Sequence, residues 1–546
     1  MNNNVVEPTN DTTINQPDVQ PEEKKPKKKK SKVGIVILVI VLILALLGCA
    51  YFFLVANKGN SVDKVENEVK EVASEYRMSG NGLENFDLYF LKIENEAKNK
   101  VYSPLSIKYA LEMLAEGASG ETKKQLDTII GEYESKKYSN NEHMSFANAI
   151  FIRDTFKDAI KETYTTNLSE KYGAEVINDP FTNASNLNSW INRKTLNLID
   201  KLFEDTDIQS LNFVLANALA IDMNWKNRIQ ASDAPLPEGM DQIVYGVDYR
   251  HENYSDNVPF IIGGQYPSLN FNGVDNIKAV EVAASFNRYD IINDKGEDNI
   301  RQIVTEDYQK YLDEHPEEVA ICTPVQEYVD QYIVDIGKNY QQAAVSTDYY
   351  ISDTESEKVF AKDLQTYDGT TLQYIGIMPK GDDLITYIKN VNAEKLSKII
   401  SEMKEVKYDN FEEGVITNIK GKIPLFKYEY ELKLIEDLNE LNIKDIFDIN
   451  KADLSNMLKD EKQYIGDAQH KALIEFSNDG IKAAAVTTMG GMGAAAGGCG
   501  YQEYSFDVPV KKIDITFDKP YMYIIRDKDS GEVWFTGTVY EPTQNS

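Results

Sequence analysis

The chain has 546 residues, of which 42% are hydrophobic, so it has ample material for a large buried core. Its formal net charge of −30 argues against a nucleic-acid binder, whose footprint would be a basic face. Four histidines and three cysteines form no HExxH, paired CxxC or EF-hand pattern, so the sequence predicts no metal and no cofactor. Because Cys49, Cys322 and Cys499 are few and scattered, we expect no disulfide framework.

The N-terminal region carries the pattern of a membrane-targeting signal. Residues 1–32 are polar, predicted to be disordered, and end in the basic run EEKKPKKKKSK, whereas 33–56 are uncharged and almost wholly apolar. That length suits one transmembrane helix, and the preceding lysines predict a cytoplasmic N-terminus with the remainder outside the cell membrane. LLGC at Cys49 also resembles a lipoprotein box, which would make Cys49 a lipidated N-terminus; the apolar run continues beyond it and favours the uncleaved span. Residues 57–80 are interpreted as a stalk.

The globular region, 81–546, begins with helical patterns. Apolar residues at helical spacing predict an amphipathic helix over Asn81–Leu91. Ser103 and Pro104 stand where the next helix begins, the serine as its cap and the proline in its first turn, and Gly117 ends it. A second short helix is predicted for ETKKQLDTII, which follows directly.

From this point a family resemblance develops along the chain. VYSPLSIKYALEMLAEGASGETKKQL resembles the opening pattern of serpins, and the later matches follow in serpin order: SFANAIFIRDTFK, LNSWINRKTLNLIDKLF, LNFVLANALAIDMNWK, YIGIMPKG, KIPLFKYEYELKLIEDLNELNIKDIFD, AQHKALIEFSNDGIKAAAVTT and FDKPYMYIIRDKDSGEVWFTGTVYEP. The resemblance covers Asn81–Pro542. It implies an α+β serpin fold with three β-sheets, about eight to nine helices and an exposed reactive-centre loop.

One insertion interrupts the resemblance. About 100 residues more than the family needs lie between Lys226 and Thr370, and the extra part is about 233–346. VPFII suggests a strand and EDYQKYLDEH a helix, so the insertion is expected to be structured. Its alternatives are a structural embellishment and a binding or dimerisation surface.

The stretch Glu475–Gly500, EFSNDGIKAAAVTTMGGMGAAAGGCG, stands out because no charged residue lies between Lys482 and Glu503. Composition alone fits a flexible linker. The serpin resemblance implies instead a reactive loop, 481–505, that a serine protease cleaves as an acyl-enzyme and that then inserts into the central sheet. Every second residue from Ile481 to Gly491 is uncharged, so that face could be buried in a sheet, and Lys482 falls on the opposite face.

The resemblance also predicts where the hinge and the scissile bond of the reactive loop lie. Gly480 and the run Ala483, Ala484, Ala485 match the family hinge, but Ile481 and Lys482 depart from it, which puts fast inhibition in doubt. A count from the hinge glycine places the scissile bond between Ala494 and Ala495, which suits an elastase-like or subtilisin-like protease. The loop up to Phe517 is about 15 residues longer than in typical relatives, so Met492 and Cys499 remain alternative bait residues. Cys499 is otherwise expected to be a free, inert thiol.

Several polar residues match the family region that opens the sheet. These are Ser103, Ser106, Asn217 and His470, and Trp225 is expected at the top of the same sheet. None has a catalytic role, because the chemistry belongs to the attacking protease.

Three functions compete. The first is a membrane-tethered, extracytoplasmic inhibitor of serine proteases whose partners are the target protease and the membrane. The second is a non-inhibitory surface protein of the same fold, with the insertion 233–346 binding a ligand or partner. A hydrolase has little support because the chain lacks a GxSxG elbow and His470 has no evident nucleophile beside it.

Overall fold

The computed structural model describes residues 74–226, 229, 268–337, 340–343, 349–460, 462–478, 480–481 and 499–544. The predicted tail, the predicted span at 33–56 and most of the predicted stalk lie outside these ranges. Within them, no helix combines the length and the apolar character needed to cross a bilayer.

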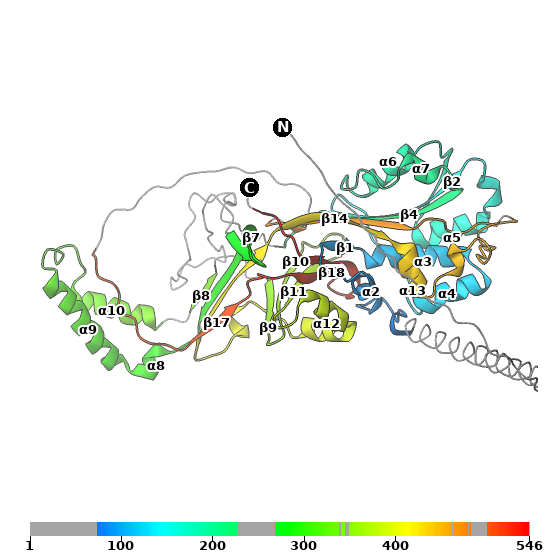
Figure 1. The fold of residues 1–546 in the computed structure, drawn as a ribbon. Helices are drawn as coiled ribbons and strands as arrows, with labels where there is room; N and C mark the ends of the chain where they lie inside the picture. Colours follow the sequence, from blue (N-terminus) through cyan, green and yellow to red (C-terminus); the bar gives the residue numbers. More distant parts are fainter. Residues whose placement is uncertain are drawn as a thin grey trace, which may run out of the picture. The chain divides into compact units, whose positions relative to one another are not determined.

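The described residues form an α+β fold (Figure 1). They contain twelve α-helices: α2 (Phe86–Ile93), α3 (Pro104–Gly117), α4 (Gly120–Ile130), α5 (Glu162–Tyr172), α6 (Ser185–Lys194), α7 (Asp205–Ile208), α8 (Ile291–Lys295), α9 (Glu297–Glu314), α10 (Val325–Ile336), α11 (Leu384–Asn390), α12 (Ala393–Ser401) and α13 (Leu434–Glu440). Short 3₁₀ turns cover Lys157–Ala159, Tyr408–Asn410 and Asp445–Phe447. The expected eight to nine helices are too few because α8, α9 and α10 come from the predicted insertion.

The start of α3 shows how local chemistry sets an element boundary. Ser103 is extended, and its side chain accepts a hydrogen bond from the Ser106 backbone N–H, while Pro104 occupies the first helical position. This satisfies one of the free N–H groups at the helix N-terminus, and proline has no N–H there to leave unsatisfied. The predicted cap is therefore confirmed, and α3 is fixed against β4 (Phe213–Ile221).

Two large sheets form the body. A seven-stranded sheet has the order β1 (Lys100–Tyr102), β19 (Val533–Val539), β18 (Tyr521–Asp527), β11 (Leu372–Pro379), β10 (Glu357–Asp363), β9 (Tyr349–Asp353) and β12 (Lys404–Glu405). A five-stranded sheet has the order β17 (Val510–Asp514), β13 (Ile416–Pro424), β7 (Val274–Asn287) and β6 (Ser268–Phe271), with β8 (Tyr340–Ala343) also paired to β7.

The segment predicted as an insertion therefore contains two different parts. β7 pairs with β13 along nine residue pairs and belongs to the five-stranded sheet, although it lies within 233–346. The helices α8, α9 and α10 follow it and have a small core of their own, formed by Ile291, Ile300, Val304, Val329, Tyr332 and Ile333. On α9 the buried residues recur every fourth position, which is the stripe of an amphipathic helix.

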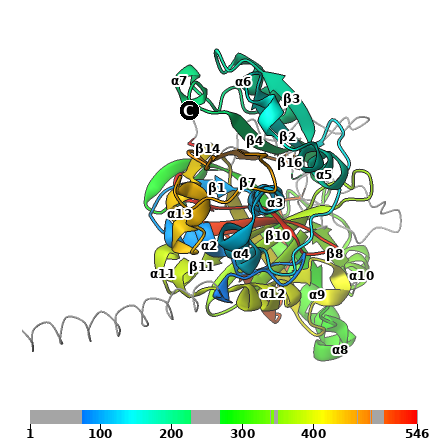
Figure 2. The same cartoon turned by 90° about the vertical axis from the view of Figure 1, so that its right-hand side faces the viewer.

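Two smaller sheets complete the described fold. One has the order β3 (Glu175–Asp179), β2 (Met144–Arg153) and β4; the other has the order β14 (Phe426–Lys433), β15 (Gln469–Phe476), β16 (Gly480–Ile481) and β5 (Met223–Asn224). The expected number of three sheets is thus wrong for the described residues, which form four. β4 and β15 are not hydrogen-bonded to each other, and α3 lies beneath β4 in both ribbon views (Figure 1, Figure 2).

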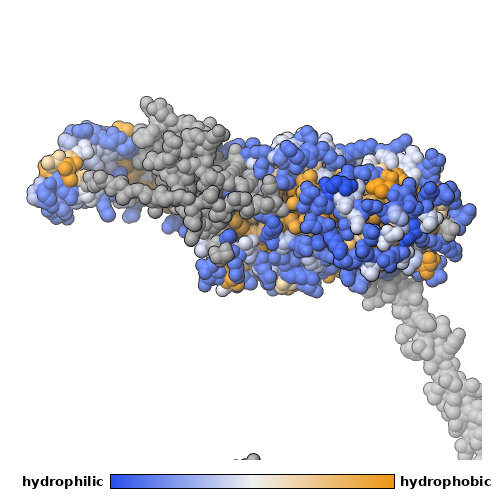
Figure 3. All heavy atoms as spheres, turned by 90° about the horizontal axis from the view of Figure 1, so that it is seen from above, coloured by the Kyte–Doolittle hydropathy of each residue, from blue (hydrophilic) through white to orange (hydrophobic). Residues whose placement is uncertain are grey.

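The interior is apolar and rich in aromatic residues. All three tryptophans, Trp190, Trp225 and Trp534, are almost completely buried. The face of the described residues seen in Figure 3 is largely hydrophilic, in keeping with the high charge of the chain. Stability therefore rests on apolar burial inside, while the acidic surface provides solubility.

Candidate functional site

A slot lies between the facing edges of β4 and β15. A smaller and a larger cavity are lined by residues of both strands and share Thr195, Ile199, Leu219 and Phe535. Among the described residues β4 bonds to β2 alone, and β15 meets its second neighbour, β16, only at Phe476. Edge strands of this kind present unpaired N–H and C=O groups, so the slot can accept one more strand and bond it on both sides.

One end of the slot already holds the start of such a strand. Gly480–Ile481 forms β16, in which Ile481 is opposite both Phe476 of β15 and Met223 of β5. The Ile481 side chain is 2% exposed and lines the smaller cavity. The predicted hinge residue that departs from the family therefore contributes apolar burial, which suits a β-branched side chain.

Gly480 is required by close backbone approach. A Cβ at this position would stand 2.1 Å from the Met223 carbonyl oxygen and 2.6 Å from Asn224 Cα. The turn before it is held by Ser477, whose backbone N–H donates to the Gly480 carbonyl at 3.0 Å. Only glycine lets this hairpin lie so close to β5.

Trp225 covers the same end of the slot. Its indole Nε1 donates to the Ser477 carbonyl at 2.9 Å, and its ring meets the ring of Phe476 edge-on at 5.4 Å. The side chain is 1% exposed. The structure thus brings the predicted Trp225 and the first two hinge residues together.

A chain of polar contacts occupies the other end of the slot. The Ser103 backbone N–H donates to His470 Nε2 at 2.9 Å, and the Ser106 hydroxyl donates to Asn217 Oδ1. Asn217 in turn donates to Asn148 Oδ1 at 2.6 Å. The network joins α3, β4, β2 and β15, so the four predicted polar residues lie together; Asn148 is a member that the sequence motifs did not single out.

His470 is neutral at physiological pH. Burial lowers its pKa to about 4, and its Nε2 must be unprotonated to accept the Ser103 N–H. A neutral imidazole avoids placing a charge between two sheet edges. Because this nitrogen is already occupied by a backbone donor, it is not aimed at a nucleophile as a hydrolase base would be.

The remaining predicted loop residues lie largely outside the described part of the chain. This applies to Lys482, to Ala483, Ala484 and Ala485, to Met492, and to Ala494 and Ala495 at the candidate scissile bond. Cys499 is described, and it is bonded to Cys322 in the segment between α9 and α10. The expectation that Cys499 is a free thiol is therefore wrong.

Sequence reasoning missed this bond because the two cysteines are 177 residues apart and only the fold places them side by side. One available signal was the aromatic run YQEYSF, which begins two residues after Cys499 and whose Tyr504 and Phe506 pack against the helices of the insertion. Glu318, Cys322 and Cys499 lie close together, but sulfurs bonded to each other offer no thiolate to a metal.

The α+β fold, the seated residues Gly480–Ile481 and the neighbouring edges of β4 and β15 define the class of protein to compare with. The family model described as Serpin (serine protease inhibitor) matches residues 85–235 and 340–542, well over half of the chain. The chain belongs to the serpin family. Serpins are in general protease inhibitors rather than enzymes.

Curated relatives agree with this assignment. An uncharacterised serpin-like protein of Methanosarcina acetivorans is 21% identical over 489 residues, covering 85% of this chain and 86% of the relative. Mouse neuroserpin is 23% identical over 480 residues, covering 83% and 88%. Mouse leukocyte elastase inhibitor A is 29% identical over 177 residues, covering 32% and 42%.

Solved structures show the same fold. The thermophilic serpin tengpin in its native state aligns with a TM-score of 0.53 at 19% identity, covering 84% of this chain and 93% of tengpin. Thyroxine-binding globulin in complex with thyroxine aligns with a TM-score of 0.52 at 16% identity, covering 87% and 100%. At these identities the likeness concerns the fold alone.

Proposed function

We propose that this serpin is a membrane-tethered, extracytoplasmic suicide-substrate inhibitor of serine proteases with a small specificity pocket, elastase-like or subtilisin-like. The observation that carries the proposal is the seating of Ile481 at the top of a slot whose edge strands, β4 and β15, meet no further strand among the described residues. Cleavage between Ala494 and Ala495 would form an acyl-enzyme on Ala494. The freed strand would then enter the slot and carry the protease with it.

The register of the seated hinge supports the rest of the insertion. Extending the Phe476–Ile481 pair down the slot places Lys482 opposite Glu475 on the outer face. Glu475 already has a cationic neighbour, with Lys427 Nζ 3.0 Å from its carboxylate. A second lysine beside it is an opposite-charge cross-strand pair, so the unusual Lys482 is compatible with insertion.

The opposite face is apolar or small. Ala483, Ala485 and Thr487 would follow Ile481 on the inward side, where the slot is lined by residues such as Leu219 and Ile474. Replacing open edges by a strand bonded on both sides favours the cleaved state, since each backbone hydrogen bond contributes about 1 kcal/mol. Cleavage should therefore raise the melting temperature.

The inhibition test uses the full-length chain in detergent with subtilisin or pancreatic elastase. We expect a 1:1 complex that survives SDS, and a raised melting temperature in chain cleaved at the loop. On a non-reducing gel the Cys322–Cys499 bond should keep the fragment Ala495–Ser546 in the complex, and reduction should release it. Clean turnover without a complex or a rise in melting temperature would refute inhibition and favour a non-inhibitory serpin whose insertion binds a ligand.

The proposed location rests on the apolar run 33–56 and its basic flank. A disulfide in the described region fits an oxidising, extracytoplasmic compartment. An epitope tag at the N-terminus separates the two anchors in membrane fractions. A tag retained on the mature protein supports the span, whereas its loss by cleavage before Cys49 supports the lipoprotein.

A further inference from the structure

A cavity lies between the edge of the seven-stranded sheet and the edge of the five-stranded sheet. It measures about 230 Å³ and is lined by residues of β9 and β12 on one side and of β13 and β17 on the other. It shares no described lining residue with the slot between β4 and β15. Concave spaces of a few hundred cubic ångströms are the usual sites of small molecules, so this cavity is a candidate site for a small ligand.

One surface of the cavity, its floor, is apolar. Ile351 of β9, Phe411 and Ile513 of β17 form this floor. The Phe411 ring stacks on the Phe286 ring with 4.9 Å between the centroids, and Arg288 Nη1 donates to the Phe411 carbonyl at 2.6 Å. Packing and hydrogen bonding therefore hold the floor in place, and a pre-formed apolar surface suits the apolar body of a ligand.

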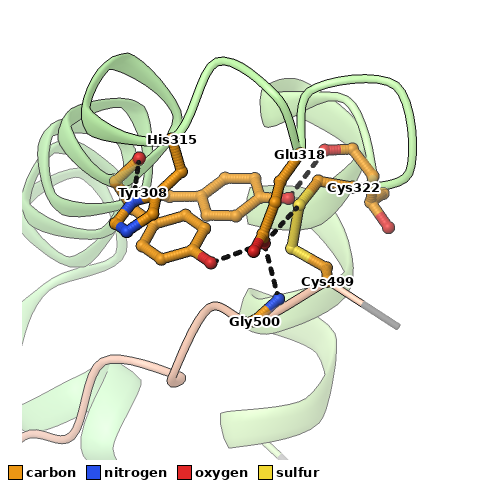
Figure 4. Close-up of a disulfide and its surroundings, with 8 residues drawn as sticks. Tyr308, His315, Glu318, Cys322, Cys499 and Gly500 are labelled. Atoms are coloured by element: carbon orange, nitrogen blue, oxygen red, sulfur yellow. Dashed lines mark hydrogen bonds between the residues drawn. A yellow bond between two sulfur atoms is a disulfide. The ribbon is translucent and has the colours of Figure 1, made fainter. Parts of the chain in front are cut away.

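The strand β17 forms a wall of the cavity, and the chain is fastened just before this strand begins. Cys499 is bonded to Cys322, and the backbone N–H of Gly500 donates to Glu318 Oε2 at 2.8 Å (Figure 4). Val508 then packs on the small core of α8, α9 and α10, two residues before the start of β17. Because this wall is already positioned, a ligand does not have to order it on binding.

The open edge of β17 gives the cavity a backbone donor. The Pro509 carbonyl accepts a hydrogen bond from the Ile416 N–H of β13. Six residues further on, the Ile515 N–H donates to the Lys420 carbonyl of the same strand. Backbone groups along a strand point alternately to its two edges, so the N–H of Lys512 points away from β13. Lys512 lines the cavity, and its N–H is therefore directed to the ligand side.

The charges around the cavity leave an excess of cations. Each of the three carboxylates that line it already has a lysine within 4 Å. These pairs are Asp353–Lys380 at 2.6 Å, Glu402–Lys398 at 3.9 Å and Glu412–Lys511 at 2.7 Å. Two further lining lysines, Lys404 and Lys512, form no such pair with a described carboxylate. In a chain with a net charge of −30 this local excess favours an anionic ligand.

Lys404 and Thr417 are placed to bind the polar end of such a ligand. Lys404 is the antiparallel partner of Ile351, so the two side chains leave the same face of the sheet, and the ammonium group lies on the side of the floor. The Thr417 side chain is 1% exposed, and its hydroxyl has no hydrogen-bond partner among the described residues. An unpartnered buried hydroxyl costs free energy, which an acceptor on the ligand would recover.

We propose that this cavity binds a small organic anion, a carboxylate carried on an aromatic body. The body lies on the floor, and the carboxylate takes the Lys404 ammonium, the Lys512 N–H and the Thr417 hydroxyl. The site is separate from the slot, so this proposal does not depend on the proposed inhibition of proteases.

The test uses 3-phenylpropionate as the probe and the full-length chain in lipid nanodiscs, with empty nanodiscs as the blank. Titration calorimetry measures the Kd, and the melting temperature gives a second readout, because a ligand that binds the folded state raises it. 3-Phenylpropionamide is the uncharged match with the same aromatic body. Lys404→Glu replaces the proposed cation. Lys389→Glu is the matched control, because Lys389 of α11 is exposed, does not line the cavity and gives the same change in charge.

We expect wild type and Lys389→Glu to bind 3-phenylpropionate with a Kd of about 1 mM or lower and to melt at a higher temperature with it. Lys404→Glu should bind the probe at least tenfold more weakly, and wild type should bind the amide at least tenfold more weakly than the acid. A wild type with neither binding heat nor a shift in melting temperature at ten times this Kd would overturn the site. Equal affinity of Lys404→Glu and Lys389→Glu, or equal affinity of wild type for acid and amide, would overturn the recognition of an anion.

Discussion

Gly480→Ala is the sharpest single test of the hinge seat, which is the pairing of Gly480–Ile481 with β15 and β5. The new Cβ would stand 2.1 Å from the Met223 carbonyl oxygen, a distance that forces the hairpin off β5. The seat then loses the burial of Ile481, which contributes about 1.5–3 kcal/mol. It also loses the hydrogen bonds between Ser477 and Gly480, each contributing about 1 kcal/mol. We therefore expect the seated hinge to be destabilised by about 3–5 kcal/mol.

The functional consequence follows from competition between insertion and hydrolysis. Once the acyl-enzyme has formed, the loop either enters the slot or is released by water. A loss of about 3 kcal/mol at the start of insertion slows that step about 100-fold, so hydrolysis wins and the number of inhibitor molecules consumed per protease rises steeply. Titration of a fixed amount of protease with the variant measures this number directly.

Gly381→Ala is the matched control, because no atom lies within 4 Å of its added Cβ. It should inhibit like wild type. The number of inhibitor molecules consumed per protease should be much higher for Gly480→Ala than for Gly381→Ala. Equal numbers for the two variants would show that the hinge seat has no part in insertion.

Three further predictions concern stability. His470→Gln should remove part of the pH dependence of unfolding. Burial lowers the pKa of His470 to about 4, so its contribution to stability is full above the ordinary pKa of about 6.5 and falls by about 3 kcal/mol as the pH drops from there to 4. Urea titrations across this pH range would show the loss in wild type and not in the variant. Trp225→Phe should lower the free energy of unfolding by about 1–2 kcal/mol, because the Ser477 carbonyl loses its donor; an unchanged urea midpoint would contradict this. Lys108→Met should lower the free energy of unfolding by about 3–5 kcal/mol, because Lys108 Nζ lies 2.6 Å from Asp87 Oδ1 and both side chains are fully buried. The double variant Lys108→Met/Asp87→Asn should recover most of this loss in the same urea titration, because it leaves no unpaired buried charge.

Local chemistry was readable from the sequence wherever it involved neighbours along the chain. The start of α3 followed from a serine cap and a proline in the first turn, and both are where that pattern placed them. The strand KALIEF is β15, and EDYQKYLDEH falls mainly within α9. The family resemblance added the order of the elements, which periodicity alone does not give.

Contacts between distant segments were not readable in this way. The bond between Cys322 and Cys499 depends on the insertion and the loop flank meeting in space, and single-sequence spacing carries no such signal. The range 233–346 merged the sheet strand β7 with the helices α8, α9 and α10, because their sequences give no sign that the strand pairs with β13 whereas the helices form a small core of their own. The sheet count failed for a related reason: β4 and β15 are well-formed strands, but in the part of the chain that the structure describes no strand joins the two.

Both ends of the reactive loop are held by described residues. Gly480–Ile481 is seated at one end, and Cys499 and Gly500 are bound at the other. A protease must hold its bait extended on both sides of the bond that it cuts, and a cysteine in a disulfide beside a bound glycine cannot be held in that way. The interpretation of Cys499 as bait therefore loses its support. Residues 482–488 are needed to match β15 from Glu475 down to Gln469 once the register of Ile481 is extended. A cut after Ala494 satisfies both conditions, because it supplies the whole strand and leaves four residues before Cys499.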